Sequence, residues 1–405
     1  MSNHLVVMIL ALLLGLQAIT TDLYLPALPA LGEGFGASMA EAQLTLTAPL
    51  LAFGLSQLVW GPLSDRFGRR PVLLWGLGGY TLASIVTVFA PSIAWLIVGR
   101  MVQGAAMGAG VMCARALVRD LYEPVAGAQA MSRGLTGLGL IACFSAPLGG
   151  LLSDLFGWRA ALLALAVFGA ISLLLVALRF KETLAHKNLN ALQPGPLLRR
   201  CLEIARNPTF VAFTVLSVTS FGGLFTFLAA SPFVMIKVLG YSKTQYGLMM
   251  FSMSLAYIGG TLFCRWLLPR VGVRRAVSLA ACLSLAGGSA MGVLALSGVQ
   301  NVWAIMLPFY LFVFAHGVHQ PCSQSGAVSP FPYAAGTASA LNGFAMMAVA
   351  FAMGAWLGTH MDGSVLPLTN GIWFWSIGIA LAAWLLVGRY GEHRPVAPSA
   401  TPAAG

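Results

Sequence analysis

Long apolar stretches separated by short polar connections constrain this chain more than any other feature of its sequence. Each stretch is close to the roughly 20 residues with which a helix crosses the hydrocarbon core of a bilayer. Since 59% of the 405 residues are hydrophobic and 8% are charged, a soluble fold would lack the polar side chains to cover its surface. The pattern therefore predicts an all-α integral membrane protein with twelve transmembrane helices. They are expected at Leu5–Pro26, Ala42–Trp60, Val72–Ala90, Ile93–Ala114, Ser132–Leu152, Ala160–Leu178, Phe210–Ala230, Tyr246–Trp266, Ala276–Leu296, Val302–Pro321, Thr337–Thr359 and Gly371–Val387.

The basic residues are distributed unevenly between the connections. The net charge of +11 does not indicate a nucleic-acid-binding protein, because the sequence offers neither a basic face nor a known binding module. With a cytoplasmic N-terminus, eighteen basic residues fall on the cytoplasmic side and three on the other, so both termini are expected in the cytoplasm. The eighteen are Arg66, Arg69, Arg70, Arg115, Arg119, Arg133, Arg179, Lys181, Lys187, Arg199, Arg200, Arg206, Arg265, Arg270, Arg274, Arg275, Arg389 and Arg394, and the three are Arg159, Lys237 and Lys243.

The connection Gly61–Pro71 reads Gly-Pro-Leu-Ser-Asp-Arg-Phe-Gly-Arg-Arg-Pro. A solvated charge run would explain its arginines, but it would explain neither the acid nor the glycines. Gly61 allows a neighbouring helix to approach closely, and Gly68 can supply a turn with positive φ. Asp65 can accept hydrogen bonds at the start of the next helix. The sequence thus predicts a loop of defined shape at a membrane surface.

Part of this loop recurs 204 residues later, which indicates two six-helix halves. Leu63, Arg66, Gly68 and Arg70 correspond to Leu267, Arg270, Gly272 and Arg274. A parallel repeat of this kind places a substrate cavity between the halves, which rock against each other in alternating access. We expect the halves at 1–180 and 209–390, a cytoplasmic linker at 181–208 and a disordered tail at 391–405. Pro269 stands in the second loop where the first loop has Asp65, so the second loop is expected to be a weaker latch than the first.

The linker carries alternating apolar and basic residues between Leu197 and Arg206. This pattern predicts a short amphipathic helix at the cytoplasmic surface. The alternative is a flexible linker whose arginines only enforce the topology.

The Gly61–Pro71 loop resembles the loop 2-3 signature of the major facilitator superfamily. The matching residues are Gly61, Leu63, Asp65, Arg66, Gly68, Arg69 and Arg70. The run Gly99–Gly108 resembles the helix 4 motif R-x-x-Q-G of that superfamily, and Lys181–Leu184 resembles the usual end of its first half.

Further stretches resemble the bicyclomycin and chloramphenicol resistance (Bcr/CflA) branch. They are Thr21–Pro29, Ala114–Asp120, Ser231–Phe233, Gln245–Gly247 and Pro330–Leu341. The resemblance implies a proton-coupled exporter of drugs or related small amphiphilic molecules in a bacterial inner membrane. It also implies a charge relay that closes the cytoplasmic side, which we call the latch. The latch residues would be Gly61, Asp65, Arg66, Gly68, Arg69 and Asp120. The alternative is a set of solvated ion pairs, each worth about 0 to 1 kcal/mol.

Asp22 and Arg100 are the candidates for proton coupling. At a rise of about 1.5 Å per residue, Asp22 lies about 6 Å and Arg100 about 10 Å from the outer ends of their predicted helices. In the superfamily that the sequence resembles, both of these helices line the cavity. A change in the burial of the carboxyl, or in its distance from the guanidinium, would load or release a proton. The alternative is a static salt bridge between Asp22 and Arg100 that only stabilises packing.

The substrate cavity is expected to present large apolar and amphipathic side chains. The candidates are Tyr24, Phe53, Gln103, Phe225, Phe227, Met253, Tyr257, Phe309 and Tyr310. The alternative for each aromatic ring is packing or contact with lipid. His316 and His319 are expected to be polar packing residues near the cytoplasmic end of their helix, with a cavity-lining role as the alternative.

Three classes of function fit a membrane protein of this kind. The favoured class is a drug:proton antiporter, and the second is a transporter of a physiological solute such as a nucleoside, amino acid or sugar. A sensor or membrane enzyme is disfavoured, because an enzyme needs a nucleophile, a metal or paired carboxylates. The six cysteines lack the spacing of a metal site or a disulfide framework. We expect a monomer in the lipid bilayer that binds a small molecule and protons, without metal or cofactor.

Overall fold

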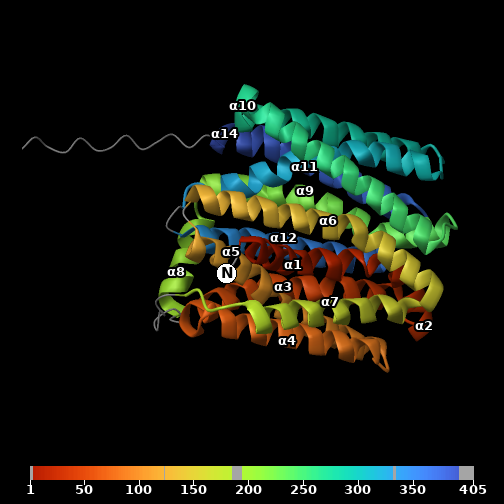
Figure 1. Ribbon diagram of the computed structural model, residues 1–405. Coiled ribbons are helices and arrows are strands. Elements are labelled where there is room, and N and C mark those ends of the chain that lie inside the picture. Colours follow the sequence, from red (N-terminus) through yellow and green to blue (C-terminus); the bar gives the residue numbers. More distant parts are fainter. Residues whose placement is uncertain (1–2, 123, 185–193, 332–333, 392–405) are drawn as a thin grey trace, which may run out of the picture.

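The computed structural model describes residues 3–122, 124–184, 194–331 and 334–391, and within them long helices run side by side (Figure 1). Eleven helical segments are long and apolar enough to cross a membrane. One of them, α10, contains two spans that meet at Gly272. The predicted all-α fold with twelve spans is therefore confirmed for the described part of the chain.

The helices of the first half are α1 (Asn3–Asp22), the 3₁₀ turn η1 (Leu25–Ala27), α2 (Leu28–Phe35), α3 (Met39–Phe67), α4 (Arg69–Val88), α5 (Ile93–Leu121), α6 (Pro124–Phe156) and α7 (Trp158–Arg179). The short α8 (Pro194–Ala205) leads to the second half, which contains α9 (Pro208–Pro232), the π-helical turn η2 (Phe233–Val238), α10 (Lys243–Leu296), α11 (Val302–Val328), α12 (Ala335–His360), α13 (Leu366–Leu381), the π-helical turn η4 (Ala382–Val387) and α14 (Gly388–Tyr390). Because α1 begins at the end of the bundle that carries α8, we call this end the linker end and the opposite one the α2 end (Figure 1).

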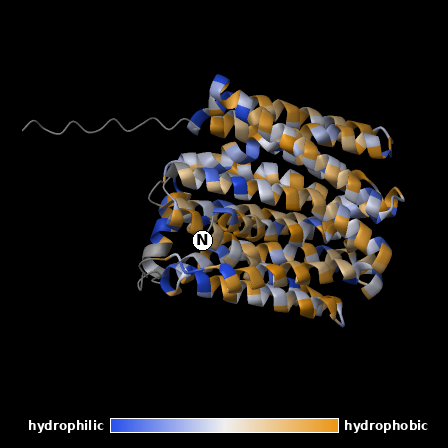
Figure 2. Ribbon diagram, viewed as in Figure 1, coloured by the Kyte–Doolittle hydropathy of each residue, from blue (hydrophilic) through white to orange (hydrophobic). Residues whose placement is uncertain are grey.

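The outside of the bundle is apolar, whereas hydrophilic residues are concentrated toward the helix ends (Figure 2). Large apolar side chains on outer helices are more than half exposed, among them Leu82 of α4, Leu178 of α7 and Leu385 of η4. An apolar surface of this extent needs an apolar environment. The bundle is therefore built to be surrounded by lipid.

Sharp turns at Gly68 and Gly272 join the second and third spans of each half. Their φ angles are +112° and +75°, a region that residues with a Cβ rarely adopt. The two glycines are 204 residues apart, as the sequence repeat predicts. Gly61 differs from expectation, because a Cβ there would meet only the Met112 methyl at an ordinary 3.5 Å.

The first span is longer than predicted. Helix α1 ends at Asp22, and the chain continues through η1 and α2 to Phe35. The break follows from Pro26, which has no N–H to bond the carbonyl of Asp22, and Pro29 then lies in the first turn of α2, where proline is tolerated. Asp22 therefore lies in the interior of a span that covers Asn3–Phe35.

Two long helix pairs join the halves: α3 packs along α12, and α6 packs along α10. At several points of these seams, a glycine of one helix lies in close contact with the other helix. A Cβ at Gly354 of α12 would overlap the Thr47 side chain of α3, and one at Gly247 of α10 would lie 2.6 Å from the Ala146 carbonyl oxygen of α6.

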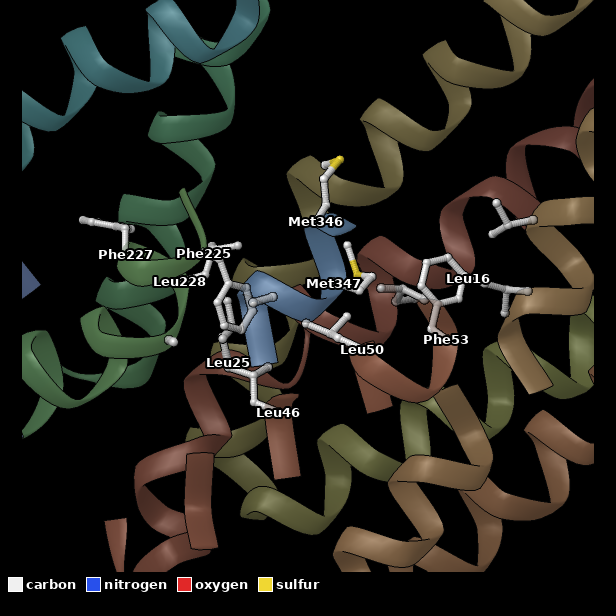
Figure 3. Close-up of a cluster of buried hydrophobic side chains, with 14 of the residues drawn as sticks. Leu16, Leu25, Leu46, Leu50, Phe53, Phe225, Phe227, Leu228, Met346 and Met347 are labelled. Atoms are coloured by element: carbon white, nitrogen blue, oxygen red, sulfur yellow. The ribbon is translucent and has the colours of Figure 1, made fainter. Parts of the chain in front are cut away.

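An apolar cluster contributed by both halves fills the space beside the α3–α12 seam (Figure 3). Leu46 and Leu50 of α3 lie there with Phe225 of α9 and with Met346 and Met347 of α12. All five side chains are at most 5% exposed. Two of these residues, Leu50 and Phe225, also line the cavity described below.

The linker region contains the predicted amphipathic helix as α8. Ile204 is 1% exposed, whereas Leu198 and Leu202 of the same helix are about half exposed or more. Part of the predicted linker, residues 185–193, and nearly all of the predicted tail, 392–405, lie outside the described residues.

Candidate functional site

A cavity of about 280 Å³ lies between the halves, at the level of the middle of α11. Its walls come from α1, α3 and α6 of the first half and from α9, α10 and α11 of the second. Three of the predicted cavity residues line it, namely Phe225, Met253 and Tyr257. Most of the lining is apolar, and its polar members are Gln17, Thr21, Asp22, Ser254, Tyr257, His316 and Gln320. The cavity therefore offers a largely apolar volume with a few hydrogen-bonding groups and one acid.

The other predicted cavity residues are packing residues away from it. Phe227 stacks on Phe309 with ring centroids 3.7 Å apart, and Phe53 is 3% exposed within the apolar cluster (Figure 3). Tyr310 shares a hydrogen bond of 2.7 Å with the Ser252 hydroxyl. The remaining two, Tyr24 and Gln103, surround Arg100.

Asp22 contributes a carboxylate to the cavity wall. It is the one acidic residue among the described lining residues. No hydrogen bond or ion pair joins its carboxylate to another residue of the described ranges. The Asp22 carboxylate therefore has no protein cation as a partner among the described residues, and it is accessible to a ligand in the cavity.

Arg100 does not pair with Asp22, and each of its three nitrogens bonds another group. Its Nε donates to the Thr45 carbonyl at 3.2 Å, its Nη2 to the Thr20 carbonyl at 3.1 Å, and its Nη1 to Gln103 Oε1 at 2.6 Å. Its guanidinium also lies 4.3 Å from the centre of the Tyr24 ring. The Asp22–Arg100 salt bridge that was weighed as an alternative is therefore absent, and the two side chains are not in direct contact.

Both backbone carbonyls that Arg100 binds have lost their helical partners. The N–H of Tyr24 bonds the Thr21 carbonyl in the 3₁₀ turn, which leaves the Thr20 carbonyl free. Pro49 stands four residues after Thr45 and has no N–H to offer its carbonyl. Arg100 therefore satisfies two orphaned acceptors that helix irregularities in α1 and α3 create.

The motif around Arg100 connects α5 with three other helices, α1, α3 and α4. Gln103 Nε2 donates to the Ser84 hydroxyl of α4 at 2.6 Å, so Gln103 fixes Arg100 against a third helix. A Cβ at Gly104 would overlap the Pro49 carbonyl oxygen, so this glycine allows α5 to touch α3. In this chain each named residue of the R-x-x-Q-G pattern therefore makes a packing or hydrogen-bond contact between helices.

The direction of Asp22 explains why the two charges miss each other. Arg100 lies at the level of Thr20 and Tyr24, which are four residues apart and share one face of the chain. Asp22 follows Thr20 by two residues, which is about 200° around a helix. Its carboxyl therefore points away from Arg100 and toward the cavity.

Polar contacts connect the halves at the α2 end. Glu33 of α2 forms an ion pair with Lys237 of η2. Gln43 Nε2 of α3 donates to the Ala229 carbonyl of α9 at 2.8 Å. Asp154 of α6 accepts hydrogen bonds from the backbone N–H and the hydroxyl of Thr244 at 2.8 and 2.6 Å. These contacts hold this end of the bundle closed.

The predicted latch residues Asp65, Arg69 and Asp120 meet at the linker end. Arg69 Nη1 donates to Asp65 Oδ1 at 2.7 Å and to the Ser64 hydroxyl at 2.6 Å, and Arg69 Nε donates to Asp120 Oδ2 at 2.9 Å. The Arg69 side chain is 1% exposed. All of these residues belong to the first half, so their contacts connect α3, α4 and α5 and do not bridge to the second half. Arg66 instead lies over the Phe67 ring at 5.5 Å.

Glu182 completes this cluster, a role that was not expected from its sequence. Its carboxylate accepts the backbone N–H groups of Arg69 and Arg70 at 2.9 and 3.0 Å, the position at the start of α4 that was expected for Asp65. Burial alone would raise the pKa of Glu182, but the N–H donors of Leu184, Arg69, Arg70 and Thr183 outweigh it and lower the pKa below its usual value. The one sequence feature that pointed to Glu182 was the Lys181–Leu184 stretch, which resembles the usual end of the first half.

The two histidines of α11 differ in position. His316 lines the cavity, and its Nδ1 lies 2.8 Å from the Ser220 hydroxyl of α9. His319 is fully buried and is not among the described lining residues. Gln320, one residue further, returns to the cavity wall.

Several curated relatives of this chain are bacterial resistance proteins. It is 34% identical to the multidrug resistance protein D of Escherichia coli over 341 residues. This alignment covers 83% of this chain and 84% of that protein. It is 28% identical over 332 residues to a chloramphenicol resistance protein of Pseudomonas aeruginosa, with coverage of 80% and 77%. A bicyclomycin resistance protein homologue of Haemophilus influenzae is 27% identical over 359 residues, covering 88% and 89%.

Solved structures share the fold at low sequence identity. The partially occluded, inward-open xylose transporter XylE from E. coli matches with a TM-score of 0.77 at 14% identity, over 97% of this chain and all of that one. An inward-facing bacterial homologue of the human lysosomal transporter Spinster matches with a TM-score of 0.75 at 15% identity, covering 97% and 99%. Residues 10–355 match the Major Facilitator Superfamily. Together these matches show that the chain belongs to the Major Facilitator Superfamily.

Proposed function

We propose that this chain exports small amphiphilic drugs across a bacterial inner membrane in exchange for protons. The observation that carries the proposal is the Asp22 carboxylate, which faces a largely apolar cavity between the halves without a cation partner. The resistance proteins named above support the substrate class. We further propose that the protein acts as a monomer with both termini in the cytoplasm, so that the α2 end is periplasmic.

Proton exchange follows from competition for one carboxylate. In an apolar cavity a bare negative charge is costly, so Asp22 is neutralised either by a proton or by a bound cationic group. Substrate arriving from the cytoplasm then releases the proton inward, and a proton arriving from outside releases the substrate.

The contacts between the halves support alternating access. The α2 end is closed by the Glu33–Lys237, Gln43–Ala229 and Asp154–Thr244 contacts, so this conformation does not open to the proposed outside. The outward-open state requires these contacts to separate. At the linker end, Arg115 Nη1 donates to the Ser339 hydroxyl at 2.9 Å and so connects α5 with α12.

The linker-end cluster acts, in this proposal, within the first half. Arg69 joins α3 to α5 through Asp65 and Asp120, and Glu182 ties the end of the half to the start of α4. The cluster keeps the first half rigid, so that the half moves as one body. In this proposal the cluster braces the first half internally, in place of the expected charge relay that closes the cytoplasmic side.

The proposal is tested with purified protein in proteoliposomes under an imposed pH gradient. Wild type is expected to accumulate a fluorescent lipophilic cation against its concentration gradient, and Asp22→Asn is expected to lose accumulation. Counterflow of this cation without a pH gradient is expected to weaken as well, because the neutral side chain mimics the protonated state, which offers the cation no carboxylate to bind.

The matched control is Asp362→Asn, which removes an exposed acid whose Oδ1 accepts hydrogen bonds from Ser364 at the α2 end. Its uphill transport is expected to equal that of wild type. Uphill transport retained in Asp22→Asn would refute the role of Asp22 as the obligatory proton carrier.

A further inference from the structure

Helix α11 presents a polar face to the cavity from the second half of the chain. Val313, His316 and Gln320 line the cavity at spacings of three and four residues, which places them on one face of the helix. The proposed proton site, Asp22, lies in the first half. The α11 face therefore supplies the second half with polar groups that the exchange described above does not use.

His316 is positioned by a hydrogen bond that leaves one ring nitrogen for a ligand. Its Nδ1 pairs with the Ser220 hydroxyl at 2.8 Å, and Ser220 is fully buried in α9. When Ser220 donates, Nε2 carries the hydrogen and is a donor, and when Nδ1 donates, Nε2 is an acceptor. The ring can therefore present either type of group to a molecule in the cavity.

Gln320 adds an acceptor that the protein leaves unsatisfied. Its Oε1 is buried and has no hydrogen-bond partner within the described residues. Burying an amide oxygen without a partner is unfavourable, so a ligand that supplies a donor removes this cost. Gln320 lies four residues after His316, one turn along the same face.

In the first half, a polar residue that precedes a packing glycine has a structural task. There Gln103 precedes Gly104, which packs on the backbone of α3, and Gln103 holds the buried Arg100. In the second half His316 precedes Gly317, where a Cβ would lie 2.7 Å from the Tyr257 carbonyl oxygen of α10.

The position three residues before the polar group differs between the halves. It is Arg100 in the first half and Val313 in the second, and Val313 is an apolar part of the cavity wall. His316 thus has no buried cation to hold. Its free nitrogen is available to a ligand in the cavity.

We propose that His316 and Gln320 form a hydrogen-bonding subsite for the uncharged polar group of a substrate, such as an amide or a hydroxyl. The apolar body of that molecule would lie against Phe225, Met253 and Tyr257, which share the cavity. This inference deepens the proposed drug export. It assigns recognition of neutral polar groups to the second half and recognition of cations to Asp22 in the first.

Two probes separate these roles by equilibrium binding to purified protein. Radiolabelled chloramphenicol is uncharged and carries an amide and two hydroxyl groups, whereas tetraphenylphosphonium is a cation without hydrogen-bonding groups. His316→Phe and Gln320→Leu are each expected to weaken chloramphenicol binding about tenfold, the change expected when one or two hydrogen bonds are lost. Tetraphenylphosphonium binding is expected to stay within about twofold of wild type.

Controls distinguish recognition from general damage. His316→Gln keeps a donor and an acceptor and is expected to restore most of the chloramphenicol affinity. His319→Leu removes the neighbouring histidine outside the cavity and is expected to leave both affinities unchanged. Size-exclusion profiles identify misfolded variants, and if His316→Phe misfolds, Gln320→Leu carries the test.

Two results would overturn the inference: unchanged chloramphenicol affinity in folded His316→Phe or Gln320→Leu, or equal losses for both probes. Binding requires no pH gradient, so it is independent of proton exchange. If Asp22→Asn still transports uphill while His316→Phe loses chloramphenicol selectively, the coupling proposal fails and the subsite stands. The reverse pair of results leaves coupling intact and removes the subsite.

Discussion

Replacing Arg100 by methionine tests whether this arginine is needed mainly for its hydrogen bonds. Arg100→Met keeps much of the side-chain length but removes every donor. The carbonyls of Thr20 and Thr45 and the Oε1 of Gln103 then lose the donor that bonds them at 3.1, 3.2 and 2.6 Å. The protein is therefore expected to fold less stably even if its cavity is unchanged.

The expected loss is about 3 kcal/mol in the free energy of unfolding, from three acceptors at about 1 kcal/mol each. The low end of the range applies, because removing the guanidinium also removes the cost of burying its charge. Arg100→Lys is expected to lie between wild type and Arg100→Met, since an ammonium group reaches fewer of the three acceptors at once.

A second substitution isolates one of the three hydrogen bonds. Pro49→Ala restores a backbone N–H four residues after Thr45, so the Thr45 carbonyl regains a helical donor. In this background Arg100→Met is expected to cost about 1 kcal/mol less than in wild type. The measurement is reversible unfolding in mixed micelles with increasing sodium dodecyl sulfate, followed by circular dichroism for all four proteins of the cycle.

The control is Arg115→Met on the same helix, because Arg115 is exposed and its Nη1 bonds only the Ser339 hydroxyl among the described contacts. Its cost is expected to be below about 0.5 kcal/mol. If Arg100→Met lowers the free energy of unfolding equally in the wild-type and the Pro49→Ala backgrounds, the Thr45 carbonyl does not depend on Arg100 for its hydrogen bond.

Three further predictions concern the first half. Because the folded state lowers the pKa of Glu182, its contribution to stability is present above the ordinary value of 4.5 and is lost as pH falls through the lowered pKa. Melting temperatures of Glu182→Gln and wild type should thus differ at pH 7 and converge in acid. Asp65→Asn weakens the bond to Arg69 and is expected to slow transport without changing substrate affinity, as initial rates at several concentrations would show. Gly104→Ala forces α5 away from the Pro49 carbonyl and should lower the melting temperature by several degrees, whereas an unchanged value would contradict the close approach.

The number of spans and the turns between them could be predicted because both depend on local sequence. Apolar length sets the spans, and a glycine at Gly68 and again at Gly272 supplies the positive φ that each turn needs. The repeat of 204 residues even located the break inside α10, which is otherwise one continuous helix.

The relation between Asp22 and Arg100 could not be predicted in the same way. Rise per residue gives the depth of a side chain, but the break at Pro26 and the face of each helix decide where it points. The same limitation applies to the cavity, since Phe225 and Phe227 are two residues apart and only the first faces it. Glu182 was missed because its partners are backbone N–H groups more than 100 residues away.

The glycines of the two seams bear on how fast the halves can move. Where Gly354 meets Thr47 and Gly247 meets Ala146, no long side chain of one helix is inserted between the side chains of the other. Helices in such contact can shift along each other in small steps. No side chain has to change its rotamer or leave a gap in the facing helix before the helix can move. At these two contacts the seams would offer little resistance to rocking, while the polar contacts at the α2 end determine which position is occupied.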